Sequence, residues 1–248
     1  MKDNKGFDIF LPKIYKGDDE RFKGKPMISW SQIETWNSKS GFNTGMLGFQ
    51  EYILKYFVGA SFPDMGWGTF GTETEGYICE KQYADKFNDK EKEVLDAITP
   101  LGVFQQEGLI DFGEFVVLLY IDDMSPDFKK LRDYKTKSES SKKDLHKPEK
   151  HQLEIYSLWI QQEKGFLPEE IEYCVIERLG GKECMAGGGR DVLSIGERVW
   201  YEPYNITPER LEETKALIIN SVREISSFYK TYLKIFGDVP EVEDTPTE

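Results

Sequence analysis

The spacing of the hydrophobic residues changes near Pro100. Before that residue, apolar side chains recur every three or four positions, which is the period of an amphipathic helix. Ser29 or Ser31 can cap the first of these helices, because a side-chain oxygen accepts a hydrogen bond from the free N–H groups of the first turn. Residues 1–26 and 58–71 lack this period, so we expect them to be irregular. The expected helices span residues 30–36, 48–57, 72–87 and 90–98.

After Pro100 the pattern becomes β-rich, in three short runs that turn-like sequences separate. These runs predict a three-strand antiparallel meander. Beyond a polar loop at 138–149, the pattern predicts a helix, a strand, a hairpin and a long helix, which Pro208 begins and Gly237 ends. The expected elements are strands 102–112, 113–123 and 128–137, helix 148–164, strand 172–179, hairpin 192–204 and helix 207–236.

The chain has 248 residues, of which 39% are hydrophobic and 14% aromatic, enough for a sizeable core. We expect one α/β domain over residues 1–236, followed by an acidic, disordered tail at 237–248. No apolar run approaches the ~20 residues of a membrane helix, and the first residues lack the apolar segment of a secretion signal. Cys79, Cys174 and Cys184 form no close pair, so we expect free thiols in a reducing cytoplasm.

The net charge of −13 argues against a general affinity for nucleic acid, which is itself a polyanion. Between Lys129 and Lys150, however, nine basic residues accompany only four acidic ones. Such a basic strip can steer a phosphate backbone to one place. The simpler interpretation is a solvated charged loop, and charge alone favours that interpretation.

Asp122, Asp133 and Lys135 form the strongest candidate for chemistry. Asp133 and Lys135 are two residues apart in an expected strand, so their side chains share one face, about 6.6 Å apart along the chain. Asp122 ends the preceding strand, whereas Asp123 is expected to point away from it. Two carboxylates suit a hard cation such as Mg²⁺, and a lysine can stabilise charge on a phosphoryl group. Aspartate is also common near turns, which leaves a structural explanation open.

Glu75, Gln152 and Tyr156 are candidates with strong alternatives. Glu75 forms a capping box with Thr72, which alone explains it, or else it supplies a third acidic ligand. Gln152 and Tyr156 are four residues apart and therefore share a helix face. Glutamine can bind water or phosphate and tyrosine can stack on a base, although a place in the core is the commoner fate of such a tyrosine.

The order of these motifs resembles the PD-(D/E)XK nuclease superfamily, and in particular its RecB-like branch, which includes phage exonucleases. The resemblance rests on Gly71-x-x-x-Glu75, Ile121-Asp122, Asp133-Tyr-Lys135-Thr and Gln152-x-x-x-Tyr156, and it covers residues 27–180. The segment MISWSQIETW is also similar to the serine-rich first helix of that branch. The resemblance implies a restriction-endonuclease-like core of helix, three-strand meander, helix and strand. N-terminal helices and a C-terminal hairpin with a long helix (181–236) would surround this core.

The resemblance implies metal-dependent hydrolysis of DNA phosphodiesters in replication, recombination or repair. By it, Glu75, Asp122 and Asp133 would hold one or two Mg²⁺ or Mn²⁺ ions, with the Tyr134 carbonyl oxygen assisting. Lys135 would position or activate the attacking water. The protein would act in the cytoplasm, or in the host cytoplasm if a phage encodes it.

The resemblance also implies partners. DNA, as a single strand or a duplex end, would meet Tyr156 and the lysines of the basic strip, while Gln152 would complete the site near the scissile phosphate. A helicase or recombination protein is a further expected partner, and a membrane is not. The lysines assigned to DNA binding are Lys137, Lys142 and Lys143.

The sequence departs from the family in two ways. Many RecB-like members carry histidine where Glu75 stands, which affects the preferred metal. Members with an iron–sulfur cluster carry one cysteine after the first helix and three near the C-terminus. This chain has only Cys174 and Cys184 in its later part, so we expect no iron–sulfur cluster.

Three hypotheses follow from these observations. The first is a metal-dependent exonuclease, because the complete set of acidic residues and lysine is present. The second is a DNA-binding or complex-forming accessory protein on the same fold with a weak or inactive site, which the net charge and the missing histidine suggest. The third is a structural α/β protein whose motif matches are accidental.

Overall fold

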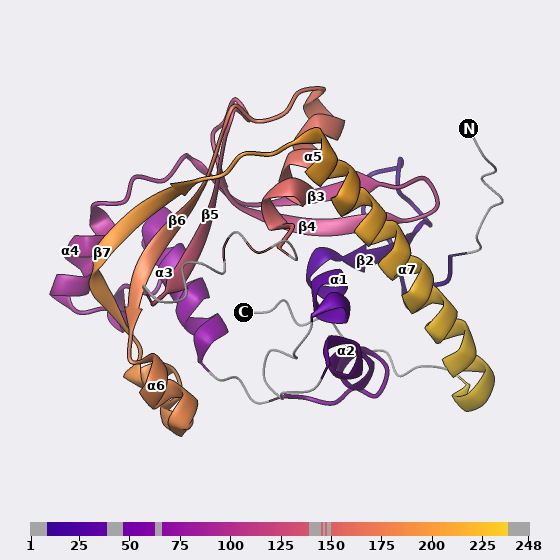
Figure 1. Cartoon of the computed structure of the whole chain (residues 1–248), viewed down its shortest axis with the longest axis horizontal. Helices are drawn as coiled ribbons and strands as arrows, with labels where there is room; N and C mark the ends of the chain where they lie inside the picture. The colour runs from indigo at the N-terminus through magenta and orange to yellow at the C-terminus, as the bar shows by residue number, and fades with distance from the viewer. Residues whose placement is uncertain are drawn as a thin grey trace. The chain divides into compact units, whose positions relative to one another are not determined.

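The computed structural model describes residues 9–38, 47–62, 66–138, 145, 147 and 150–237 (Figure 1). Its strands are β1 (Lys13–Ile14), β2 (Pro26–Ser29), β3 (Val103–Asp111), β4 (Val116–Met124), β5 (Lys130–Lys137), β6 (Glu170–Leu179) and β7 (Ser194–Pro203). Its longer helices are α1 (Trp30–Asn37), α2 (Gly48–Tyr56), α3 (Trp67–Glu80), α4 (Asp89–Asp96), α5 (Gln152–Lys164) and α7 (Pro208–Phe236). Short helical turns are η1 (Ala84–Lys86), α6 (Gly181–Glu183), η3 (Cys184–Gly188) and η4 (Arg190–Val192). None of the helices in these ranges is long and apolar enough to cross a membrane.

The strands are hydrogen-bonded in the order β1-β2-β4-β5-β6-β7, and β3 also pairs with β4. Only four residues separate β3 from β4, and so short a connection permits antiparallel pairing alone. β5 is antiparallel to β4, with Asp123 opposite Arg132. β6 follows helix α5 and is parallel to β5, as a helical crossover allows. The predicted α/β fold, with a helix, a three-strand meander, a helix and a strand in that order, is confirmed.

The described residues group into two compact units, each built from segments distant in sequence. The first unit takes its described residues from 9–62, 107–119 and 208–237, and the second from 66–106 and 120–207. The single domain expected over residues 1–236 stays a prediction. Nearly all of the expected acidic tail, and most of the expected polar loop, lie outside the described residues.

In the first unit, α1 begins at a capping box. The Ser29 side chain accepts the Gln32 main-chain N–H at 3.3 Å, and the Gln32 side chain accepts the Ser29 N–H at 3.0 Å. Asn37 then joins α1 to α7 by donating to the Ser221 hydroxyl at 2.7 Å. The expected serine cap is confirmed. Aromatic rings from α1, from α2 and the residue after it, and from α7 pack together in this unit: Trp36, Tyr52, Phe57, Phe228 and Tyr232.

In the second unit, α3 and α4 pack against strands β5, β6 and β7 (Figure 1). The apolar side chains of the two helices meet those of alternate strand residues, as the period of two along a strand requires. This core fixes α3, which carries Glu75, beside β5, which carries Asp133 and Lys135. Its fully buried members include Phe70, Ile78, Leu95, Cys174 and Ile176.

Helix α3 begins at Trp67, five residues before the expected start, and ends at Glu80 rather than near Phe87. Thr72 therefore lies inside the helix, so the predicted capping box of Thr72 and Glu75 is wrong. Gly66 precedes the helix with φ of +83°, which glycine adopts without steric cost. Gly68 and Gly71 favour a loop, which is why residues 58–71 were expected to be irregular. The helical spacing of Trp67, Phe70, Thr74, Tyr77 and Ile78 is the signal that predicts the observed helix.

The hairpin expected at 192–204 is also wrong, because residues Ser194–Pro203 form one strand antiparallel to β6. Gly196 is the turn-forming residue in that range, yet it lies within the strand. A Cβ atom at Gly196 would meet the Glu177 side chain at 2.5 Å, so glycine is needed there for close strand pairing. The hairpin is instead formed by β6, β7 and the residues between them.

Two further expectations need correction. The short strand β1 lies within the segment 1–26, which was expected to be irregular. Helix α5 begins at Gln152 rather than near Pro148. The expected strands at 102–112, 113–123 and 128–137 and the long C-terminal helix are confirmed within a few residues.

Candidate active site

Strands β4 and β5 bring Asp122 and Asp133 together. Asp123 lies opposite Arg132 in this antiparallel pair, so one further step in the same register places Asp122 opposite Asp133. Directly opposite side chains point to the same face of a sheet. Both residues are buried, and Asp133 has no exposed surface at all. The pairing of β4 with β5 thus creates a pair of buried carboxyl groups.

Lys135 neutralises part of this charge. Its ammonium nitrogen lies 2.6 Å from Oδ2 of Asp133, and 28% of its side chain stays exposed. Both oxygens of that carboxyl group are buried, and the Asp122 carboxyl group lies within hydrogen-bonding reach of them. The lysine therefore bridges the buried carboxyl groups and the solvent.

Glu75 on α3 completes an electrostatic cluster with Asp122, Asp133 and Lys135. Burial raises the pKa of Glu75 to about 8; Lys135 opposes this shift and Asp133 adds to it. Burial, and then the neighbouring Glu75, raise the pKa of Asp122 to about 6. Burial also raises the pKa of Asp133 well above its usual range. At Lys135 burial acts to lower the pKa, but the three carboxyl groups outweigh it and raise the pKa.

Gln152 and Tyr156 approach the cluster from α5. They are one helical turn apart, and the Gln152 amide donates to the Tyr156 hydroxyl at 2.6 Å. That hydroxyl in turn donates a long hydrogen bond of 3.4 Å to Oδ1 of Asp122. Tyr156 is 2% exposed, so the predicted stacking of its ring on a DNA base does not fit the structure. Its contacts instead orient the Asp122 carboxylate.

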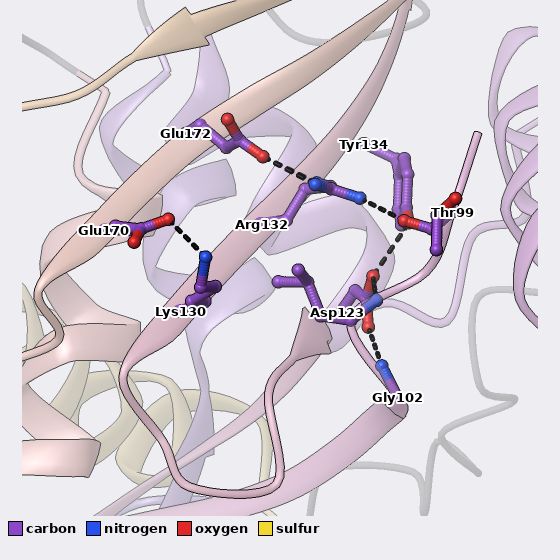
Figure 2. Close-up of polar contacts among 9 residues, drawn as sticks. Thr99, Gly102, Asp123, Lys130, Arg132, Tyr134, Glu170 and Glu172 are labelled. Atoms are coloured by element: carbon purple, nitrogen blue, oxygen red, sulfur yellow. Dashed lines mark hydrogen bonds and ion pairs between the residues drawn. The ribbon is translucent and has the colours of Figure 1, made fainter.

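Asp123 points to the opposite side of β4, as the alternation of a strand predicts. Its carboxylate accepts the main-chain N–H of Leu101 at 2.8 Å and of Gly102 at 3.2 Å, and the Tyr134 hydroxyl at 2.8 Å (Figure 2). The main-chain N–H of Tyr134 donates to Asp122 Oδ2 at 3.2 Å. Asp122 therefore binds the main chain of Tyr134, and Asp123 binds its hydroxyl group. These two contacts fix the residue that lies between Asp133 and Lys135.

Arg132 forms a second support that the sequence does not reveal. Its guanidinium donates to Glu172 on β6, at 2.7 and 2.9 Å, and to the Thr99 carbonyl oxygen at 2.8 Å (Figure 2). It also lies over the Tyr201 ring, 5.0 Å from the centroid. The partners come from three elements distant in sequence, so only the folded chain shows them. Together with Asp123, Arg132 fixes the segment before β3 to strands β4, β5 and β6.

No three His, Cys, Asp or Glu side chains of the described ranges are arranged as a ready-made metal site. The donor types of the cluster nevertheless suit a hard divalent cation, which prefers carboxylate oxygens. Three carboxyl groups act on one ammonium group, that of Lys135, which lies 2.6 Å from Asp133 Oδ2. Glu75, Asp122 and Asp133 therefore fit such a cation in chemistry, and binding requires them to shift from the positions seen here.

The structure thus brings six predicted residues together, and other predictions remain open. A metal contact by the Tyr134 carbonyl oxygen stays a prediction. Lys137 ends β5, beyond Lys135. Lys142 and Lys143, predicted to bind DNA, lie outside the described residues. The residues brought together are Glu75, Asp122, Asp133, Lys135, Gln152 and Tyr156.

Comparison with known proteins finds only distant likenesses, among solved structures. No protein-family model matches the sequence, and no curated protein matches it. One of the similar solved structures is a "Putative exonuclease" from Eubacterium rectale. The alignment covers 94% of this chain and 92% of that chain, with 10% sequence identity and a TM-score of 0.44. The function proposed below rests on this chain's own side chains.

Proposed function

We propose that the protein is a Mg²⁺- or Mn²⁺-dependent deoxyribonuclease that hydrolyses DNA phosphodiester bonds, as an exonuclease acting at DNA ends. The observation that supports this most is the cluster of Glu75, Asp122 and Asp133 around the Lys135 ammonium group. Burying several charges of one sign is costly unless cations compensate them. A chain that places three carboxyl groups beside one lysine favours a site that takes up a cation.

Each member of the cluster has a role in this proposal. Glu75, Asp122 and Asp133 hold the cation, which would stabilise charge on the phosphoryl group and activate water for attack. Lys135 places a positive charge at the solvent side of the same carboxyl groups, where the scissile phosphate and the attacking water arrive. Gln152 and Tyr156 fix the orientation of Asp122 through a chain of two hydrogen bonds.

The resemblance to the RecB-like branch adds support, because the four motifs occur in order along the chain. Two of the spacings have a physical reason. Asp-x-Lys puts two groups on one face of β5, and Gln-x-x-x-Tyr puts two groups on one face of α5. A protein selected for structure alone gains little from burying the Asp133 carboxyl group beside that of Asp122.

The test is cleavage of DNA by the purified full chain. Linear DNA labelled at either end and closed circular DNA are incubated with Mg²⁺, Mn²⁺ or EDTA. We expect metal-dependent loss of the linear DNA while the circle stays intact, and the order in which the labels are released gives the polarity. Cutting of the circle would contradict the exonuclease mode. Binding of DNA without cleavage, under either metal, would contradict the nuclease and indicate an accessory role.

A further inference from the structure

Tyr204, the residue that follows β7, attaches the start of helix α5 to the sheet. Its hydroxyl group donates a hydrogen bond of 2.6 Å to Oε1 of Glu154, which lies in the first turn of α5. Its main-chain N–H donates to the Ile171 carbonyl oxygen of β6 at 2.8 Å, so Tyr204 is itself fixed to that strand. All three residues belong to the unit that holds the acidic cluster.

Glu154 carries a buried carboxyl group outside the acidic cluster, and none of its surface is exposed. Removing a carboxylate from water is unfavourable unless hydrogen bonds compensate it, and a hydroxyl donor at 2.6 Å lies in the range of strong bonds to carboxylates. Apolar side chains often replace a buried polar pair at little cost in stability. A hydrogen-bonded pair instead selects one position of the helix among those that apolar packing would allow.

The first turn of α5 depends on such a tertiary contact. Helices commonly fix their first turn through a side-chain cap at the preceding residue. In the described part of the chain, His151 occupies that position and gives α5 no side-chain cap. Gln152 begins the helix and Tyr156 follows one turn later, so the placement of both follows the placement of this turn.

Glu154 and Tyr156 hold two different sides of α5. They are two positions apart, which separates their side chains by about 200° around the helix axis and about 3 Å along it. Glu154 reaches Tyr204 beyond β7, and Tyr156 reaches Asp122 on β4. The bond from Tyr156 to Asp122 is 3.4 Å long, near the limit for a hydrogen bond. A small rotation or shift of the helix therefore decides whether that bond forms.

Tyr204 also contacts the face of the sheet that carries the acidic pair. Its ring meets the ring of Tyr173 on β6 edge to face, with the centroids 5.7 Å apart. Tyr173 lies beside Asp133 in the parallel pairing of β5 and β6, so the two side chains project from the same face. The contacts of Tyr204 with the helix and with the strand thus lie on the side of the sheet where the cluster is.

We propose that Tyr204 is a positioning residue of the active site: through Glu154 it fixes the start of α5 where Tyr156 orients the Asp122 carboxylate. The inference rests on the proposed nuclease function, and it adds a residue that acts on the site through α5. Asp122 is a proposed ligand of the cation, so misplacing α5 should weaken cation binding before any DNA is present.

The test measures the affinity of the full chain for Mn²⁺ alone by titration calorimetry, without DNA. Tyr204→Phe removes the hydroxyl group and keeps the ring that meets Tyr173. It should weaken Mn²⁺ binding about tenfold, an effect typical of residues that orient a metal ligand. Tyr201→Phe is the matched control, because Tyr201 pairs with Cys174 and projects from the opposite face of the sheet. It should bind Mn²⁺ as the wild type does.

A double-mutant cycle separates positioning from a general loss of stability. If Tyr204 acts through Tyr156, Tyr204→Phe should weaken Mn²⁺ binding in the wild type and have no further effect in Tyr156→Phe. Equal losses in the two backgrounds would overturn the inference.

Two variants of Glu154 provide the test if Tyr204→Phe does not fold. Glu154→Gln keeps an oxygen that accepts the Tyr204 hydroxyl, so it should bind Mn²⁺ almost as tightly as the wild type. Glu154→Leu loses that oxygen and should match the expected loss of Tyr204→Phe. Equally weak binding by both variants would also overturn the inference.

DNA cleavage at saturating Mn²⁺ gives a second readout. Tyr204→Phe should lower kcat about tenfold and leave the KM for DNA unchanged, because it alters the orientation of Asp122 and not the binding of substrate. Wild-type Mn²⁺ affinity and kcat in this variant would overturn the inference and leave the nuclease standing. A wild type that binds Mn²⁺ without cleaving DNA would overturn the nuclease, and the titrations would still decide the role of Tyr204. A wild type that does not bind Mn²⁺ would overturn both.

Discussion

The ammonium nitrogen of Lys135 lies 2.6 Å from Oδ2 of Asp133, two residues earlier on the same strand. Asp133 is fully buried, whereas 28% of the Lys135 side chain is exposed. The period of a strand places the two groups on one face, and the register of β4 and β5 adds Asp122 to them. A lysine that is both charged and accessible beside buried carboxyl groups can meet an incoming phosphate.

The two buried tyrosines near this cluster should respond differently to loss of a hydroxyl group. Tyr134→Phe removes a hydrogen bond to the buried Asp123 carboxylate, and we expect a loss of about 1.5–3 kcal/mol in the free energy of unfolding. Cleavage per folded molecule should change little, because the main chain of Tyr134 still orients Asp122. Urea denaturation and the rate of DNA cleavage are measured for Tyr134→Phe and for Tyr156→Phe.

Tyr156→Phe is the matched change on α5. It removes the group that links Gln152 to Asp122, so we expect slower cleavage with a smaller loss of stability. If Tyr134→Phe instead slows cleavage of the folded protein more than Tyr156→Phe does, the assigned roles are wrong.

Replacing Glu75 should alter the response of the protein to metal. In wild type, Mg²⁺ at about 100 times its dissociation constant should stabilise the fold by about 2.7 kcal/mol. Glu75→Gln removes one proposed ligand and should reduce this gain. Glu80→Gln, at the exposed end of the same helix, is the control and should keep it. Equal metal-induced shifts in melting temperature for Glu75→Gln and wild type would exclude Glu75 as a ligand.

The stability of the metal-free protein should fall as pH rises toward 8. The folded-state pKa is about 8 for Glu75 and about 6 for Asp122, both above the unfolded values near 4. The folded protein therefore holds more protons than the unfolded chain in this window, and the stabilisation is lost as pH rises through the folded pKa values. The melting temperature, measured in EDTA across this pH range, checks the prediction. It should fall less with rising pH in Glu75→Gln than in the wild type.

Added Mg²⁺ should reverse this trend, because a cation and a proton compete for the same carboxyl groups. The increase in melting temperature on adding Mg²⁺ should be larger above pH 8 than below pH 6, the pKa values of Glu75 and Asp122. A metal-induced increase that is independent of pH would place the cation elsewhere.

The sequence predicts those parts of the site that depend on local period. Asp-x-Lys on a strand, Gln-x-x-x-Tyr on a helix and the outward direction of Asp123 all follow from alternation or helical spacing. The meander also follows, because turn residues separate its strands. The sequence does not predict the start of α3, because its glycines favour a loop more strongly than the spacing of Trp67 and Phe70 favours a helix. Glycine is tolerated inside that helix because tertiary packing stabilises it.

The supports of the site depend on contacts between distant segments. Asp123 receives main-chain N–H groups from Leu101 and Gly102, and Arg132 reaches Thr99, so their roles appear only once the segment before β3 is folded. The stack of Arg178 on Trp67 joins a strand to a helix far earlier in the chain. No local pattern in the sequence encodes such pairings.

The central claim is that Lys135 and its carboxyl neighbours perform metal-dependent cleavage of DNA. The most direct measurement compares nucleotide release by wild type, Lys135→Ala and Lys130→Ala in Mn²⁺. Lys130 lies on the same strand but pairs with Glu170 at the surface, where an ion pair contributes little (Figure 2). We expect Lys130→Ala to keep wild-type activity and Lys135→Ala to lose at least about a hundredfold, with circular dichroism showing both folded. Wild-type activity in a folded Lys135→Ala would contradict the account.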